Sequence, residues 1–154
     1  KAAFCRDWGA DHAINYRAGD FAEQARAIAP EGVDVILDMV GAPYAQRNLS
    51  LLRRDGRLVI IAFLEGSRGE LDLLPIMVKR LVVTGSTMRP RTVAEKTALR
   101  DALRNNVWPA LEDGTIRTHV AARFPLADAA KAHRLMESGR LIGKVVLDIA
   151  GEAE

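Results

Sequence analysis

Val33-Asp34-Val35-Ile36-Leu37-Asp38-Met39-Val40-Gly41 is the stretch of this sequence that decides its fold. It is a short apolar run that ends at Gly41, and Pro43 opens the segment that follows. A strand that is apolar on both faces is typical of the middle of a parallel sheet with helices on either side. Because ligands of open α/β sheets bind beyond the carboxyl ends of the strands, we expect a binding site around residues 39–41.

A second stretch repeats this pattern. Residues 57–63 form another apolar run, preceded by an amphipathic segment that closes at Asp55 and Gly56. Two such strands with a helix between them make a βαβ unit, which favours a nucleotide-binding sheet. The sequence contains neither G-x-G-x-x-G nor G-x-x-x-x-G-K-[ST], so the glycine turn that brings a backbone up to a pyrophosphate is absent. Since Lys1 also stands inside a predicted helix, we expect the chain to be the back half of a larger protein.

The remaining segments alternate between predicted strands and helices. Strands are predicted at residues 12–16, 81–86 and 144–149, with an extended piece at 116–124. Asp20 and Pro43 each mark the start of a helix, and a helix is also predicted near 71–77. A capping box at 92–95 opens the longest predicted helix, which Gly114 ends, and residues 126–138 form the last one. This alternation predicts a doubly wound α/β fold.

Composition limits the functions to be considered. A chain of 154 residues that is 49% hydrophobic and 27% charged is long enough for one domain with a real core. Its 22 basic and 20 acidic residues are scattered, which argues against binding to nucleic acid or to a membrane surface. The single cysteine, Cys5, excludes an internal disulfide framework and a zinc site built from cysteines, and it fits a cytoplasmic location.

No residue is predicted to act as a catalytic acid, base, nucleophile or metal ligand. Asp34 and Asp38 share a strand face but stand roughly 13 Å apart, which is too far for a coupled carboxylate pair. We expect Asp38 instead to bind nearby backbone amides. His12, His119 and His133 have no metal-binding spacing and no partner in a nucleophile motif, so all three are interpreted as structural.

Five segments together resemble a known family. They are Ala-Asp-His-Ala-Ile-Asn-Tyr (10–16), Gly-Val-Asp-Val-Ile-Leu-Asp-Met-Val-Gly (32–41), Asp-Gly-Arg-Leu-Val (55–59), Val-Thr-Gly-Ser-Thr-Met-Arg (83–89) and the segment 133–147. Nearly the whole chain is similar to the cofactor-binding half of the zinc-independent quinone oxidoreductases. These zeta-crystallin relatives belong to the medium-chain dehydrogenase/reductase superfamily, whose scaffold is shared by enoyl reductases and alcohol dehydrogenases.

The resemblance implies a fold and a division into domains. The family has a GroES-like catalytic domain and a Rossmann domain with the sheet order 3-2-1-4-5-6. This chain then holds a partial Rossmann-type, doubly wound parallel sheet that lacks the first two strands and the glycine turn, with a gap between residues 13–16 and 33–39. Residues 1–125 form the partial dinucleotide-binding domain, residues 126–150 return toward the catalytic domain, and residues 151–154 are a polar tail.

The resemblance also implies a set of cofactor-binding residues. Lys1 and Tyr16 fall where the family holds the adenosine phosphate of NADPH, and they favour NADP over NAD. The other candidates end two strands or precede the last one: Met39, Val40, Gly41, Ala62, Phe63, Leu64, Leu141, Gly143 and Lys144. Lys1 can equally be a solvated lysine, and Lys144 is more readily interpreted as a solvated cation than as a ligand.

An activity and a partner follow from the same resemblance. The parent protein is expected to transfer hydride from NADPH to a quinone or an activated alkene, with no metal and with any proton donor in the absent domain. The strand at 81–86, from Leu81 to Ser86, is expected to pair with its mate in a homodimer. Alternatives are an enoyl-thioester reductase, a non-catalytic dimerisation fragment, or a separate chain that supplies the missing half. By itself, the chain is expected to be inactive.

Overall fold

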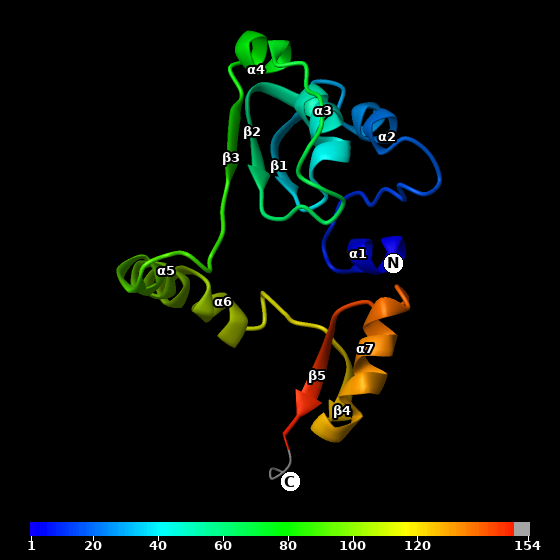
Figure 1. Ribbon diagram of the computed structural model, residues 1–154, viewed down its shortest axis with the longest axis vertical. Coiled ribbons are helices and arrows are strands. Elements are labelled where there is room, and N and C mark those ends of the chain that lie inside the picture. Colours follow the sequence, from blue (N-terminus) through cyan, green and yellow to red (C-terminus); the bar gives the residue numbers. More distant parts are fainter. Residues whose placement is uncertain (150–154) are drawn as a thin grey trace. The chain divides into compact units, whose positions relative to one another are not determined.

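A computed structural model describes residues 1–149 of the chain, which divides into two units, Lys1–Arg91 and Thr92–Glu154. Each unit has its own parallel sheet (Figure 1). The α/β class expected from the sequence is therefore confirmed. The domain boundaries expected at residues 125 and 150 remain predictions, and the polar tail expected at 151–154 lies outside the described residues.

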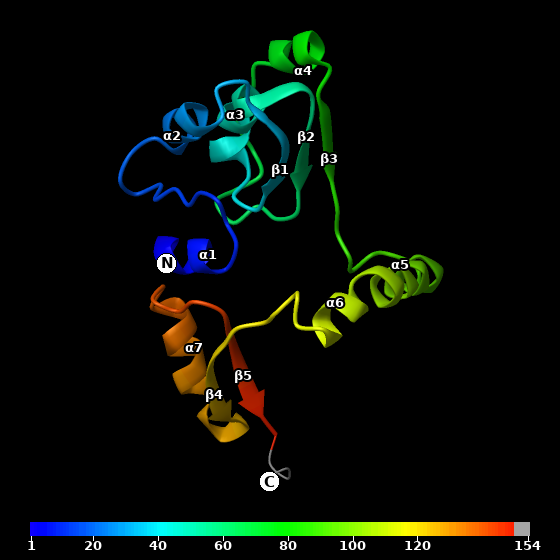
Figure 2. The ribbon, with the colours of Figure 1, turned by 180° about the vertical axis from the view of Figure 1, so that it is seen from behind.

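The first unit is built on a three-stranded sheet in the order β1-β2-β3. Its strands are β1 (Val33–Asp38), β2 (Leu52–Ile60) and β3 (Val82–Gly85), and both pairs are parallel. Both views of the ribbon place β3 at the edge of the sheet away from helix α2 (Figures 1 and 2). The helices are α1 (Ala2–Asp7), α2 (Phe21–Ile28), α3 (Ala42–Leu51) and α4 (Leu74–Lys79).

The core of this unit lies between the sheet and helices α3 and α4. Leu49, Leu52, Leu58 and Leu81 are buried together, and four further aliphatic side chains pack against them: Val33, Ile36, Ile60 and Ile76. The Lys79 ammonium adds a polar link, since Nζ donates to the carbonyls of Ser50 at 2.9 Å and Leu52 at 2.8 Å. The ammonium thereby donates to carbonyls at the end of α3, which lack amide partners because the helix does not continue.

An aromatic cluster joins α2 to α3. The rings of Phe21 and Tyr44 stack with centroids 4.5 Å apart. The Arg47 guanidinium lies 4.7 Å from the first centroid and 4.8 Å from the second, so it makes a cation–π contact with each ring. Asp20 begins α2 as expected, because its side chain accepts a hydrogen bond from the amide of Ala22.

One expectation about the sheet was wrong, because residues 12–16 form no strand. β1 lies at an edge of the described sheet, in agreement with the gap expected beside residues 33–39. A strand is held by the hydrogen bonds of a neighbour, and the described chain offers residues 12–16 no such neighbour. One face of β1 is also uncovered, since Val35 is 60% exposed and Leu37 is 62% exposed.

The second unit contains helices and a two-stranded parallel sheet. Its helices are α5 (Val93–Asn106), α6 (Trp108–Glu112) and α7 (Ala129–Glu137), with the 3₁₀ turn η1 (Leu126–Asp128) ahead of α7. Strands β4 (Val120–Pro125) and β5 (Lys144–Asp148) pair in parallel. The capping box at the start of α5 is confirmed, since the Thr92 hydroxyl accepts from the Glu95 amide and the Glu95 carboxylate accepts from the Thr92 amide.

The single long helix expected up to Gly114 was wrong. Helix α5 ends at Asn106, and α6 starts anew at Trp108 with Pro109 in its first turn. Proline has no amide hydrogen and its ring clashes with the preceding turn, so it is tolerated at a helix start but not in the interior. The apolar periodicity continues across Val107, which is why the pattern alone did not predict the break.

Candidate functional site

The turn that follows β1 is organised by the Asp38 carboxylate. Asp38 is only 5% exposed, and its two oxygens accept hydrogen bonds from the amides of Val40 and Gly41, both at 3.0 Å. The expectation that Asp38 binds nearby backbone amides is therefore confirmed. Since both of its oxygens are engaged inside the turn, Asp38 fixes the shape of residues 39–41 rather than taking part in chemistry.

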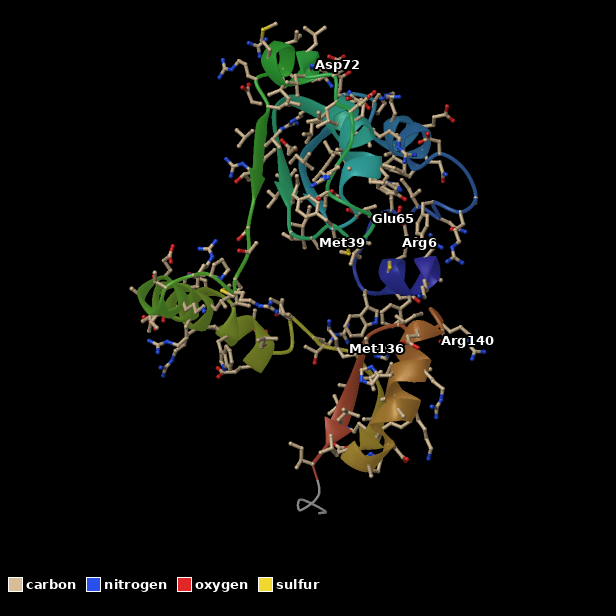
Figure 3. The ribbon with its side chains drawn as sticks, viewed as in Figure 1. Arg6, Met39, Glu65, Asp72, Met136 and Arg140 are labelled. Atoms are coloured by element: carbon tan, nitrogen blue, oxygen red, sulfur yellow. The ribbon has the colours of Figure 1, made fainter. Side chains whose placement is uncertain are left out.

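The same turn is hydrogen-bonded to the segment that follows β2. The amide of Leu64 donates to the Met39 carbonyl and the amide of Glu65 to the Val40 carbonyl, each at 3.0 Å. The amide of Ala42 returns a bond to the Gly66 carbonyl at 2.9 Å. Figure 3 shows Met39 and Glu65 at the same end of the unit, with Asp72 at the opposite end. The structure thus brings residues 39–41 and 63–66 together where two parallel strands end.

Gly41 is required where these two segments meet. Its φ of 100° lies in a region that residues with a Cβ rarely adopt. A Cβ at this position would also lie 2.4 Å from the Gly66 carbonyl oxygen and 2.9 Å from Cδ1 of Phe63. Gly41 therefore contributes close approach of the backbone and no chemistry of its own.

A groove of about 620 Å³ opens beyond the carboxyl ends of β2 and β3. It contains Ala62 and Phe63, two of the residues expected to bind a cofactor, together with apolar and hydroxyl side chains from both strands: Ile60, Ile61, Val83, Thr84, Gly85, Ser86 and Thr87. The wall is apolar on the β2 side and bears hydroxyls on the β3 side. This groove is the candidate functional site of the first unit.

The hydroxyl residues of this groove were missed as binding residues at the sequence level. The sequence predicts residues 81–86 only as an edge strand for dimerisation. The expectation that ligands bind beyond the carboxyl ends of parallel strands, which pointed to residues 39–41, applies to this strand as well. Thr84, Ser86 and Thr87 stand at the carboxyl end of a parallel strand, where ligands of such sheets bind. The signal was therefore present, in the Gly85-Ser86-Thr87 sequence that ends the strand.

Lys1 and Tyr16 lie outside this groove. Lys1 occupies the N-cap position of α1 and is exposed. Tyr16 is 60% exposed, and the Arg17 guanidinium lies 6.0 Å from the centroid of its ring. Their assignment to the phosphate of NADPH remains a prediction.

Leu141, Gly143 and Lys144 belong to the second unit, where they lead into β5. Gly143 has a φ of 96°, and a Cβ there would lie 2.5 Å from the carbonyl oxygen of His119. The amide of Lys144 donates to that same carbonyl at 2.9 Å, which fixes the start of β5 beside the segment before β4. The close packing explains the glycine by local structure, and a cofactor role for the three residues remains a prediction.

Comparison with known proteins places the chain in a family. The family described as zinc-binding dehydrogenase matches residues 8–147. The chain belongs to the zinc-binding dehydrogenase family. The expected membership of the medium-chain dehydrogenase/reductase superfamily is thereby confirmed.

Three of the proteins to which the chain is similar have enzyme names. The chain is 31% identical to the 2-haloacrylate reductase of a Burkholderia species, over 96% of the chain and 44% of the relative. It is 33% identical to a mycocerosic acid synthase-like polyketide synthase of Mycolicibacterium smegmatis, over 94% of the chain and 7% of the relative. The solved Escherichia coli quinone oxidoreductase complexed with NADPH superimposes with a TM-score of 0.76 at 27% identity, over 96% of the chain and 46% of that protein. The chain thus spans less than half the length of these proteins.

The dehydrogenase family's name implies zinc, which would need suitable ligand side chains close together in this chain. Tetrahedral zinc takes three or four nitrogen, sulfur or carboxylate ligands. Among residues 1–149, no group of three or more His, Cys, Asp or Glu side chains could hold a metal ion. The described residues therefore do not fit a zinc site. Within that same range no helix has both the length and the apolar character needed to cross a membrane.

Proposed function

We propose that this chain is the C-terminal, cofactor-binding portion of an NADPH-dependent oxidoreductase that transfers hydride to a quinone or an activated alkene. One observation carries the proposal: residues 39–41 and 62–64 meet at the carboxyl ends of adjacent parallel strands, beside a groove with an apolar wall. That edge is where open α/β sheets bind nucleotides. NADPH is proposed because the solved Escherichia coli quinone oxidoreductase, which matches 96% of the chain, is complexed with NADPH.

The described residues fit the ring-bearing end of the cofactor. The groove offers apolar contact from Ile61 and Phe63, and Gly85 lines it without a side chain. When bound, NADPH supplies the hydride, while the protein binds and orients the reacting partners. Among the described residues that line this groove there is no carboxylate, imidazole, amine or thiol, and the proposal assigns no acid, base or nucleophile to the chain.

A second candidate is an enoyl-thioester reductase. Its support is the 33% identity to a mycocerosic acid synthase-like polyketide synthase. The 2-haloacrylate reductase also acts, by its name, on a conjugated alkene rather than a quinone. Both candidates use the same hydride donor, so they differ only in the acceptor.

The test begins with the protein expressed from its complete reading frame. Its intact mass is compared with the 16.8 kDa of this chain, and NADPH oxidation is then followed with a quinone, a 2-haloacrylate and an enoyl thioester. Oxidation with the quinone supports the first candidate, and oxidation only with the thioester supports the second. A protein of larger mass that oxidises NADPH with none of the three contradicts both. A mass of 16.8 kDa with no turnover favours a non-catalytic dimerisation fragment.

We also propose that β3 pairs with a second copy of the chain. The strand is at an edge of the described sheet, and Val82 and Val83 are both exposed there. An apolar edge strand left bare is an aggregation site, so pairing with an identical strand would remove that hazard. A cytoplasmic location, consistent with the single cysteine, belongs to the same proposal.

A further inference from the structure

Arg91 binds the segment that closes the groove after β3. Its Nη2 donates to the hydroxyl oxygen of Ser86 at 2.9 Å, and its Nε donates to the carbonyl oxygen of Thr87 at 3.0 Å. The side chain is half-buried, and the Arg91 amide closes a turn onto the Met88 carbonyl at 3.3 Å. A planar guanidinium that binds two adjacent acceptors fixes both of them, which a single flexible amine does less well.

This arrangement sets the direction of the Ser86 hydroxyl. A guanidinium has donors only, so Ser86 Oγ must act as the acceptor toward Arg91. The hydroxyl proton remains available for donation, since Ser86 is exposed and its Oγ is found among residues 1–149 only as the acceptor of the Arg91 bond. The Ser86 amide donates to the Ile60 carbonyl at 3.0 Å, which continues the β2–β3 ladder and holds the backbone in place. Ser86 is thus a fixed hydroxyl donor at the rim of the groove.

The other residues that line the groove indicate which kind of ligand the Ser86 hydroxyl can bind. Ile61 and Phe63, which follow β2, provide apolar surface for a planar ring, and Ser86, which follows β3, lines the same groove. A ring with a carbonyl oxygen at its edge satisfies both surfaces. Both the carboxamide of a nicotinamide and the carbonyl of a quinone have this chemistry.

We propose that Arg91 is a positioning residue, which orients the Ser86 hydroxyl to donate a hydrogen bond to a carbonyl oxygen on a planar ring held in this groove. The inference rests on the proposed function, since it describes how the same site selects its ligand. It adds a specificity-determining pair to a site otherwise defined by backbone and apolar groups.

The test uses the 154-residue chain and NMR titration of its backbone amides with three small probes at millimolar concentration. Nicotinamide and tetramethyl-1,4-benzoquinone carry the carbonyl, and the substituted quinone resists addition of the Cys5 thiol. The third probe, 3-methylpyridine, is a ring without a carbonyl. We expect the amides of Ser86 and Thr87 to shift with at least one carbonyl probe, and the probe that binds more tightly identifies the source of the carbonyl.

The variants separate positioning from simple support of the fold. Arg91→Met and Ser86→Ala are each expected to weaken binding of the carbonyl probe about five- to ten-fold, the effect of one hydrogen bond, and to leave 3-methylpyridine unchanged. Arg91→Lys should lie between them and the wild type. Arg54→Met is the matched control, because Arg54 is an exposed arginine on β2 with only a loose 3.8 Å ion pair to Asp55.

Four results overturn the inference in distinguishable ways. Wild-type affinity for the carbonyl probe in both Arg91→Met and Ser86→Ala contradicts it, as does equal weakening of all three probes. Probe-induced shifts at residues 39–41 without shifts at Ser86 or Thr87 also contradict it, yet leave the proposed function standing. If none of the probes shifts either segment of the wild-type chain, both the inference and the assignment of the groove fail.

Discussion

The amide of Gly41 donates to Oδ2 of Asp38 at 3.0 Å, within a turn of three residues. Asp38 lies at the last position of β1 and Gly41 at the N-cap of α3, so one carboxylate links a strand to the helix that follows it. The backbone of that turn then accepts hydrogen bonds from Leu64 and Glu65. The geometry of the candidate site therefore depends on a buried side chain that no ligand needs to touch.

Replacing Asp38 tests this dependence. Asp38→Ala leaves two amide donors without their acceptor, and we expect it to lower the free energy of unfolding by about 1–3 kcal/mol. Denaturant unfolding of the chain measures the change. The matched control is Asp34→Ala, because Asp34 is an exposed carboxylate on the same strand that pairs with Arg53. Exposed ion pairs contribute about 0–1 kcal/mol, so a cost at Asp34 equal to that at Asp38 contradicts the prediction.

Alanine substitutions at Gly41 and at Gly66 separate the cost of backbone strain from the cost of steric collision. The φ angles of the two glycines are 100° and 110°, but a Cβ on Gly66 would meet nothing within 4 Å. Gly66→Ala is expected to cost about 1 kcal/mol, from the unfavourable φ alone. Gly41→Ala should cost about 2–4 kcal/mol, because collision with Gly66 and Phe63 is added. Equal midpoints of urea unfolding for Gly41→Ala and Gly66→Ala would contradict this difference and show that the turn relaxes to relieve the collision.

The edge of β3 offers a test of the proposed dimer. Because hydrogen-bonding direction alternates along a strand and Ser86 bonds to β2, the amide of Val83 faces away from β2. Val83→Pro removes that outward donor and spares the β2–β3 ladder, so we expect it to shift the chain from dimer to monomer in light scattering. Val83→Ala keeps the donor and should remain dimeric. A wild-type chain that is monomeric at every concentration measured rules the dimer out.

The chain by itself is expected not to bind NADPH tightly. Its sequence has no glycine turn that would place backbone amides around a pyrophosphate, so the groove can contact only part of the cofactor. Isothermal titration calorimetry of the purified 154-residue chain measures this directly. Micromolar binding of NADPH would contradict the prediction and would require a phosphate site built in some other way.

The Asp113 carboxyl of the second unit has a shifted pKa. Hydrogen bonds from the side chain and then from the backbone of Thr115 lower the pKa of Asp113 below its ordinary value of 3.8. A lowered pKa contributes stability that is present above the ordinary value and is lost as the pH falls through the lowered one. We expect the NMR titration midpoint of Asp113 to lie below 3.8, and Thr115→Val to raise it partway back. An unchanged midpoint in Thr115→Val assigns the shift to the backbone bond alone.

The features predicted correctly from the sequence are those that depend on neighbouring residues. The strand that ends at Asp38, the Thr92 capping box and the role of Asp38 toward local amides each follow from groups within a few positions of one another. Pairing between distant segments was harder to predict. Residues 12–16 have strand-forming composition, but a strand needs a neighbour, and none is present in the described chain.

The candidate site was also difficult to predict from the sequence, because it depends on pairing between distant segments. That residues 39–41 and 63–66 meet depends on the register of β1 against β2, in which Asp38 lies beside Ile60. Likewise, the bond from Arg91 to Ser86 depends on a turn five residues long whose course no periodicity describes. The sequence predicted that residues 39–41 follow the carboxyl end of a strand, and the hydrogen bonds between loops could be found only in three dimensions.

The exposure of Val35 and Leu37 has a consequence for the chain in the cell. Both lie on the open face of an edge strand, where apolar side chains and unpaired backbone groups stand side by side. Chaperones and proteases recognise surfaces of this kind, and they act continuously on proteins that expose them. We therefore expect the lifetime of this polypeptide to be set by how soon after synthesis those two side chains are covered.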